Sequence, residues 1–431
     1  MADINIIIDK STFQSLSFSE LYRLSRYYRH NITPVLTMEI IGDLKKEFPD
    51  GKTPSEVRVK DFAKKLFPLH SVVNAHYRLL VEGDLMGDPV NSDFRPFVMM
   101  SKSVESSSGQ KGMIVKETIE EKAIYKWKDG QFTEADQELS NLWRVNTTHE
   151  NLLTNLKSYL SETFNVKLKD FNALNEYVET CLNEVTNQYP LLVSLMRNYD
   201  IDAGKGVQVT SRWNRSGRPR IKDFAEYAYH CLKVDLMFLY GLSSGLINTR
   251  PTNRVDLEYL YYLPFCHLFT SIDKFHTNLV PFLLKPTQRF IHGHELKQDL
   301  QEIVKHLNSL DQEEVKKYHH EPPINESSIT FQLWREYFGY PEHSNLNRNI
   351  SKEEFEMIKR KMDEFDEVLH EGKEVELKSS DDAEFVLKVS HMSMDDLCYC
   401  GSGKKVVDCC IPKEKFIETA LIQMKKKSQR E

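Results

Sequence analysis

The stretch DINIIID at residues 3–9 decides the fold class, because its run of isoleucines is typical of a buried strand. This predicted strand ends on Asp9. The next segment, residues 17–30 (SFSELYRLSRYYRH), has apolar side chains at helical spacing, and residues 32–48 (ITPVLTMEIIGDLKKEF) predict a short strand followed by a helix. Such alternation favours an α/β domain with a parallel sheet.

The α/β pattern stops near residue 48 and returns near residue 221. Between them lie long amphipathic segments, which predict a mostly helical insertion with a polar stretch at residues 101–112. After residue 220, an apolar helix leads into a helix at residues 253–265, a strand at residues 266–273 and further helix and strand patterns. Residues 309–395 are charged and helical, and a small hairpin is expected at residues 368–390.

Composition places the chain among soluble globular proteins. Its 431 residues are 40% hydrophobic and 28% charged, which suits two or three domains. No run approaches the roughly 18 to 20 apolar residues of a membrane span, and the N-terminus lacks the features of a signal peptide. We therefore expect a cytoplasmic protein. Its net charge of -7 means that any binding of nucleic acid would depend on local basic patches.

Four acidic side chains occupy matching positions in the predicted α/β domain. Asp9 and Asp273 each end an apolar strand, Glu39 lies in the helix after the second strand, and Asp256 begins a helix. Strand ends meet at one edge of a parallel sheet, where such folds bind their ligands. Converging carboxylates call for a hard divalent cation, and Mg²⁺ or Mn²⁺ held in this way suits phosphodiester hydrolysis. Taken singly, each acid is also explained as a turn or helix-terminal residue.

The segments that carry these acids resemble the four acidic motifs of PIN-domain nucleases. They are IIID (residues 6–9), ITPVLTMEI (residues 32–40), TNRVDLEYLYYLPF (residues 252–265) and FTSID (residues 269–273). The resemblance implies a Rossmann-like three-layer fold and Mg²⁺- or Mn²⁺-dependent endoribonuclease activity. It also implies that Asp9, Glu39, Asp256 and Asp273 bind the metal, and that Ser271 helps to hold the phosphate or a metal-bound water.

This chain departs from the family in size, since more than two hundred residues separate Glu39 from Asp256. The resemblance covers residues 1–48 and 221–308, and the insertion between them would control access of the substrate. Lys274 and His276 also lie near the predicted site. A histidine at such a position is a candidate general acid, although a packing or hydrogen-bonding role is the more common one.

A basic segment at residues 211–222 (SRWNRSGRPRIK) is the candidate nucleic-acid interface. It combines an aromatic side chain with four arginines, which suits single-stranded RNA, because bases stack on tryptophan and phosphates pair with arginine. A solvated basic linker is the alternative interpretation. The predicted substrate-binding residues are Arg212, Trp213, Arg215, Arg218 and Arg220.

Four of the seven cysteines cluster in CYCGSGKKVVDCC at residues 398–410. Cys398, Cys400, Cys409 and Cys410 can close a tetrahedral Zn²⁺ site with no open position, so the zinc would be structural. The pattern resembles the SEC-C zinc motif at the C-terminus of the bacterial preprotein translocase ATPase. That resemblance implies an interaction module for a protein or ribosome partner. The other three cysteines are predicted to be buried thiols.

Together, these patterns predict a metal-dependent nuclease, an endoribonuclease acting on single-stranded RNA, recruited through its zinc module. The resemblance also extends to toxin-like or antiviral roles. The alternative is a catalytically inactive PIN-like adaptor that binds RNA, the ribosome or a protein partner. The predicted organisation is a PIN-like domain at residues 1–48 and 221–308, a helical insertion at residues 49–220, a charged connector at residues 309–395, and the zinc module with a basic tail at residues 396–431.

Overall fold

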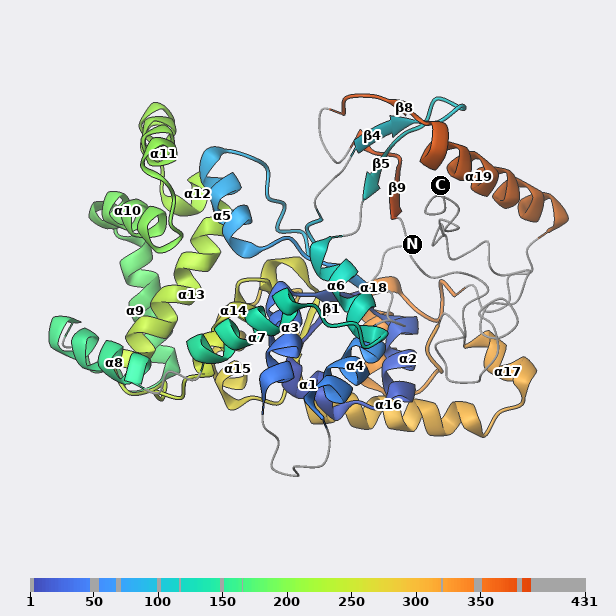
Figure 1. Cartoon of the computed structure of the whole chain (residues 1–431), viewed down its shortest axis with the longest axis horizontal. Coiled ribbons are helices and arrows are strands. Elements are labelled where there is room, and N and C mark those ends of the chain that lie inside the picture. Colours follow the sequence, from blue (N-terminus) through green and yellow to red (C-terminus); the bar gives the residue numbers. More distant parts are fainter. Residues whose placement is uncertain are drawn as a thin grey trace.

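A parallel sheet forms the centre of the molecule (Figure 1). The computed structural model describes residues 4–46, 54–66, 71–98, 102–115, 118–147, 151–164, 166–318, 321–344, 351–377 and 382–388. The five strands are all parallel and follow the order β3-β2-β1-β6-β7. Their bounds are β1 (Asn5–Ile8), β2 (Arg29–Ile32), β3 (Ser71–Val73), β6 (Leu268–Ser271) and β7 (Arg289–His292).

β1 is the central strand, as its isoleucines predict. Every residue of β1 is buried, and the strand pairs with β2 on one side and β6 on the other. Chain progression through the sheet reverses between β1 and β6, which places the topological switch point of this α/β fold there. The predicted α/β class with a parallel sheet is therefore confirmed.

Helices follow the strands where local sequence signals predict them. α2 begins with a capping box between Ser17 and Glu20, and α3 begins with Pro34 after the capping residue Thr33. α16 packs against α1 and α2, while α14 packs against α3, α13 and α15. The bounds are α1 (Lys10–Ser15), α2 (Phe18–Tyr27), α3 (Pro34–Gly42), α14 (Asn253–Leu260), α15 (Lys274–Leu279) and α16 (Gly293–Asn308).

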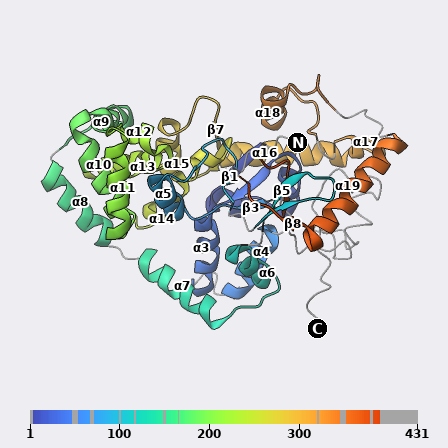
Figure 2. The ribbon, with the colours of Figure 1, turned by 90° about the horizontal axis from the view of Figure 1, so that it is seen from above.

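The segment predicted as a helical insertion is mainly helical. Figures 1 and 2 show α8 to α11 gathered around α13, to one side of the sheet. Its helices are α4 (Ser55–Leu66), α5 (Tyr77–Met86), α6 (Ile119–Lys128), α7 (Glu134–Thr147), α8 (Asn151–Phe164), α9 (Phe171–Asn183), α10 (Gln188–Asn198) and α11 (Ala203–Arg215). α12 (Ile221–Phe224) and α13 (Glu226–Ser243) follow the insertion. Short 3-10 helices are η1 (Asp43–Lys45), η2 (Val185–Asn187), η3 (Leu263–Phe265) and η4 (Val280–Phe282).

The insertion also contains strands, which its helical patterns did not predict. β3 lies within it and forms one edge of the parallel sheet, so the α/β core draws on residues after 48. β4 (Lys102–Glu105) and β5 (Lys111–Val115) form an antiparallel pair at the polar stretch. They belong to a second sheet with the order β8-β4-β5-β9.

The connector supplies the two outer strands of this second sheet. β8 (Lys373–Glu374) pairs with β4, and β9 (Phe385–Lys388) pairs with β5, so the hairpin expected at residues 368–390 does not form between them. The helices of this region are α17 (Gln312–Lys317), α18 (Ile329–Phe338) and α19 (Lys352–Glu371). No helix in the described part of the chain has the length and apolarity to cross a membrane.

α18 is anchored to the α/β core. Asp299 of α16 accepts hydrogen bonds from the backbone N–H groups of Ile329 at 2.9 Å and Thr330 at 3.0 Å. The Tyr28 hydroxyl also donates to Thr330 Oγ1 at 2.9 Å.

The zinc module predicted at residues 396–431, with Cys398, Cys400, Cys409 and Cys410, lies outside the described residues.

Candidate functional site

The four predicted acids gather around the carboxyl edge of the sheet. Asp9 directly follows β1, and Asp273 follows β6 after one intervening residue. Glu39 projects from α3 and Asp256 from the first turn of α14, and α3 and α14 pack against each other. Segments from both ends of the α/β core therefore meet at the switch point, where such folds bind ligands. We call these four residues the acidic cluster.

Asp9 is buried and held in one orientation. It caps α1, where Oδ1 accepts a hydrogen bond from the Thr12 backbone N–H at 2.9 Å. Oδ2 accepts from the hydroxyls of Ser11 at 2.6 Å and Ser271 at 2.7 Å. Burial alone would raise the pKa of Asp9, but the nearby His276 cation and these hydrogen bonds lower it. The carboxylate is therefore ionised.

His276 is completely buried, and both of its ring nitrogens face hydrogen-bond acceptors. Nε2 lies 2.7 Å from the backbone carbonyl of Asp256, which can only accept. Nδ1 lies 2.8 Å from Ser271 Oγ, whose own proton goes to Asp9, and 3.6 Å from Asp9 Oδ2. Both nitrogens therefore donate, so the ring is an imidazolium. Burial lowers the pKa of His276, but Asp9 and Asp256 raise it to about 9.

Ser271 connects the two strand ends. Its hydroxyl donates to Asp9, and its oxygen accepts from the backbone N–H of Asp273 at 2.9 Å as well as from His276. The side chain is completely buried, so it is not placed to contact a phosphate directly. Ser271 is a positioning residue for Asp9 and His276 in this arrangement.

Both carboxylate oxygens of Asp273 have bonding partners. Oδ1 accepts from the Phe275 backbone N–H at 2.7 Å, which caps α15, and Oδ2 pairs with Arg250 Nη1 at 3.1 Å. Lys274, the next residue, is exposed. Arg250 lies in the loop between α13 and α14, and the sequence pattern did not single it out. It provides a positive charge at the solvent side of the acidic cluster.

Glu39 is tied to α14 and α1 by residues that the sequence patterns missed. Glu39 Oε2 accepts from the Tyr259 hydroxyl at 2.5 Å. Lys10 Nζ donates to the Glu39 backbone carbonyl at 2.8 Å and lies 2.9 Å from Asp43 Oδ2. Burial raises the pKa of Glu39, while Lys10 and Tyr259 oppose that rise. Lys10 directly follows Asp9 in the sequence, and this position is the feature from which a role for Lys10 at the site could have been predicted.

Asp256 has fewer hydrogen-bond partners for its carboxylate than the other acids of the cluster. Its Oδ2 is buried and has no hydrogen-bond partner among the described residues. Burial raises the pKa of Asp256 to about 7, and the charges of Glu39 and Asp273 add to the rise while His276 and Arg250 oppose it. A buried, unpartnered carboxylate oxygen is costly, so this position favours a cation or a proton.

The cluster has the donor chemistry of a hard-cation site, without a preformed ligand set. Carboxylate oxygens suit Mg²⁺ or Mn²⁺, and the unpartnered oxygen of Asp256 is free to accept one. However, within the described residues no group of three His, Cys, Asp or Glu side chains is arranged to hold a metal ion. The positive charge here comes from His276, Lys10 and Arg250.

The segment predicted as a basic loop begins in the last turn of α11, continues as a loop and ends in α12. Arg212 donates to the backbone carbonyl of Leu85 at 2.9 Å, and its guanidinium lies 4.2 Å from the centre of the Phe224 ring. Trp213 is buried, and its Nε1 donates to the Pro219 carbonyl at 2.8 Å. These two side chains hold the insertion together, and the Trp213 ring is not exposed for base stacking.

The other three arginines of that segment lie on the surface. Arg215, Arg218 and Arg220 are exposed, and Arg218 Nε donates to Asn214 Oδ1 at 2.9 Å. Both overall views place the end of α11 apart from the sheet and its carboxyl edge (Figures 1 and 2). The structure therefore does not bring these arginines to the acidic cluster.

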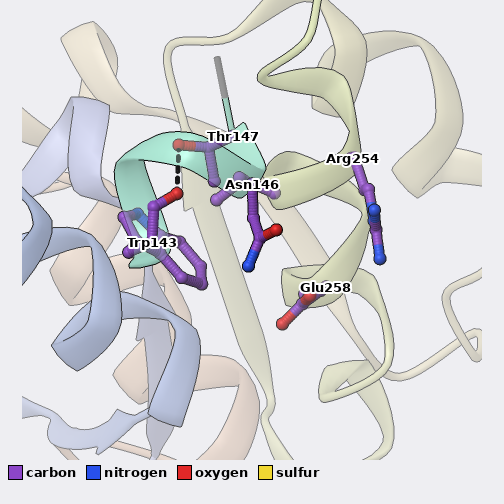
Figure 3. Close-up of a pocket in the computed structure, with 6 residues that line it drawn as sticks. Trp143, Asn146, Thr147, Arg254 and Glu258 are labelled. Atoms are coloured by element: carbon purple, nitrogen blue, oxygen red, sulfur yellow. Dashed lines mark hydrogen bonds between the residues drawn. The ribbon is translucent and has the colours of Figure 1, made fainter. Parts of the chain in front are cut away.

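A cavity of about 230 Å³ lies beside the cluster, between α7 and α14. Figure 3 shows Trp143 on one side of it, Arg254 and Glu258 on the other, and the Asn146 amide between them. We call it the α7–α14 pocket. Burial raises the pKa of Glu258 to about 7, while the charges of Arg254 and Arg78 oppose the rise and Glu39 adds to it. The residues that line it are Trp143, Asn146, Thr147, Arg254, Val255 and Glu258.

Comparison with known proteins gives no match, whether to a protein-family model, to a curated protein or to a solved structure. Functional interpretation of the chain therefore depends on the residues and geometry described above.

Proposed function

We propose that this protein is a PIN-like, metal-dependent nuclease that cleaves single-stranded RNA. The proposal rests above all on the gathering of Asp9, Glu39, Asp256 and Asp273 at the switch point of one parallel sheet. These acids come from four motifs that resemble those of PIN-domain nucleases. The strand order β3-β2-β1-β6-β7 matches the first five strands of a Rossmann-like sheet, which agrees with that resemblance.

Within this proposal, Asp9, Glu39, Asp256 and Asp273 would hold Mg²⁺ or Mn²⁺, and Asp256 supplies an oxygen without another partner among the described residues. When bound, the cation would lower the pKa of a water molecule and stabilise the oxygens of an in-line displacement. Asp9 stays ionised because three hydrogen bonds and the His276 cation orient and stabilise its carboxylate. His276 and Ser271 act through Asp9 as positioning residues.

The test is cleavage of labelled single-stranded RNA in the presence of Mn²⁺ or Mg²⁺, with single-stranded DNA and duplexes as comparison substrates. We expect Asp9→Asn and Asp273→Asn each to reduce the cleavage rate by more than roughly 100-fold, because loss of an outer-shell partner alone costs about 10- to 100-fold in metal sites. Each substitution keeps the size of the side chain, so the fold should persist. Circular dichroism would verify this.

The matched control is Glu302→Gln, an exposed carboxylate on α16 away from the cluster. It should cleave RNA at the wild-type rate. Retained cleavage in both Asp9→Asn and Asp273→Asn would refute the proposed site. Cleavage that needs no divalent cation would refute the metal-dependent mechanism.

A second candidate function is a PIN-like adaptor without catalysis. It is favoured by one observation: in the described residues, no three acids form a ligand group, and His276, Lys10 and Arg250 already supply positive charge. In that case the wild type would bind RNA and Zn²⁺ but would show neither Mn²⁺ binding nor cleavage. Recruitment through the proposed zinc module at residues 396–431 is compatible with both functions.

A further inference from the structure

The α7–α14 pocket is walled by α14, which carries Asp256, and by α7, which packs on the helix that carries Glu39. Trp143 of α7 packs on Gly42, the last residue of α3, so closely that a Cβ on Gly42 would lie 2.2 Å from Trp143 Cδ1. Glu39 lies one turn earlier on the same helix. The opposite wall is α14, which contributes Arg254, Val255 and Glu258. The pocket is therefore adjacent to the acidic cluster.

One face of α14 lines the pocket, and another face of the same helix points toward the acidic cluster. Arg254 and Glu258 are four residues apart and share one face of the helix. Asp256 and Tyr259 are rotated away from that face, toward His276 and Glu39. A ligand in the pocket would thus be separated from Asp256 by about one helix diameter, roughly 10 Å.

The lining combines groups that recognise a planar, polar ring next to a negative charge. Trp143 offers a partly exposed indole, and Figure 3 shows the Asn146 amide between this indole and α14. In the described ranges the side chains of Asn146 and Arg254 make no hydrogen bond, so their donors remain available to a ligand. The positive charge of Arg254 also acts on Glu258, which shares its face of α14.

The pocket is smaller than the roughly 300–1,000 Å³ of typical small-molecule sites, so it suits a single ring.

We propose that the α7–α14 pocket binds one nucleobase of a single-stranded RNA whose phosphodiester lies at the acidic cluster, on the other face of α14. The proposal builds on the proposed nuclease function and gives the insertion a role in substrate binding. Trp143 stacks on the base, and Asn146 hydrogen-bonds to its edge. The guanidinium of Arg254 pairs with a flanking phosphate, as arginine does at phosphate sites.

The experiment measures binding separately from cleavage. Fluorescence anisotropy would follow a labelled RNA of about ten nucleotides, within the site sizes of single-strand binders, in buffer without added Mg²⁺ or Mn²⁺. A second probe is the same backbone with its bases removed. We expect Trp143→Leu and Asn146→Ala each to weaken binding of the RNA by roughly 5- to 100-fold, as loss of a base contact does. Binding of the abasic backbone should not change.

Arg254→Gln should weaken binding of both probes, because its partner is a phosphate. The matched control is Arg197→Gln, an exposed arginine on α10, which should bind both probes like the wild type. Because Trp143 packs on Gly42, Trp143→Leu could fail to fold; Trp143→Phe retains a ring and should weaken RNA binding less. Circular dichroism of each variant distinguishes misfolding from lost contacts.

Three results would overturn the pocket assignment: no binding of RNA by the wild type, equal binding of RNA and the abasic backbone, or pocket variants that bind as tightly as Arg197→Gln. The outcome is separable from the nuclease test. A wild type that cleaves while the pocket variants bind normally leaves the nuclease proposal standing. Base-dependent binding without cleavage supports the pocket and refutes the nuclease.

Discussion

At the scale of single residues, His276 joins the segments of the acidic cluster. Its ring contacts the Ser271 hydroxyl at the end of β6 and the Asp256 carbonyl in α14, and its charge faces Asp9 after β1. The His276 side chain makes these contacts in a completely buried position, where an unpaired donor or acceptor is costly in free energy. His276 therefore contributes both to the fold and to the ionisation of Asp9.

We expect His276→Ala to lower the free energy of unfolding by roughly 2–4 kcal/mol, because it leaves a cavity and two unsatisfied buried groups. The pKa of Asp9 should rise at the same time, since its cationic neighbour is lost. Urea unfolding measures the first effect and carboxyl-carbon NMR the second. His294→Ala, an exposed position in α16, is the control and should change neither quantity. An unchanged Asp9 pKa in His276→Ala would contradict the imidazolium assignment.

At the scale of elements, the contact between α3 and α7 brings the insertion to the acidic cluster. Trp143 lies against Gly42, and Ser140 Oγ donates to the Gly42 carbonyl at 3.3 Å. The absence of a side chain at Gly42 lets the two helices approach closely. This contact sets one wall of the α7–α14 pocket.

The sign of the change in unfolding free energy caused by Gly42→Ala tests this contact. Alanine normally stabilises a helix relative to glycine by roughly 0.5–1 kcal/mol. At Gly42 the added Cβ would meet the Trp143 ring, so we expect a net loss of roughly 1–3 kcal/mol in urea unfolding.

Gly206→Ala in α11 is the matched control, because its Cβ would meet Met196 Sδ at an ordinary 3.6 Å. That variant should gain stability. Equal gains at Gly42 and Gly206 would show that α3 and α7 are not in close contact.

At the scale of the whole molecule, a buried carboxylate joins the helical insertion to the α/β core. Asp235 of α13 accepts hydrogen bonds from the Tyr199 hydroxyl at the end of α10, at 3.0 Å, and from the Tyr261 hydroxyl after α14, at 2.6 Å. Burial raises the pKa of Asp235 to about 6, although both tyrosines oppose the rise. The folded protein therefore binds this proton more tightly than the unfolded chain does.

The sign of the pH dependence follows from this raised pKa. Below about pH 4 the carboxyl is protonated in both states and adds no penalty. As the pH rises through about 6, ionisation of the buried group destabilises the fold. Relative to Asp235→Asn, the wild type should lose roughly 2–3 kcal/mol of unfolding free energy between pH 4 and pH 7. Urea unfolding at several pH values measures the difference.

Asp223→Asn, at an exposed carboxylate in α12, is the control and should give a curve parallel to the wild type. A wild-type curve that also runs parallel to Asp235→Asn would contradict the predicted penalty.

Local patterns in the sequence determined the elements around β1, β6 and β7, and they placed Asp9 and Asp273 at strand ends and Glu39 and Asp256 in helices. Strand and helix periodicity and capping signals act over a few residues, so they can be recognised without knowing the rest of the fold. This is why Asp9, Glu39, Asp256 and Asp273 could be selected before the structure, and why the parallel sheet was predicted correctly.

Only the tertiary structure decided which side chains meet. The Tyr259 hydroxyl reaches Glu39 across 220 positions, and Ser271 reaches Asp9 across 262. The burial of Trp213, the edge strand β3 and the pairing of β8 and β9 with β4 and β5 also depend on distant segments. Such contacts leave no local periodicity, because they arise from packing between elements that are far apart along the chain.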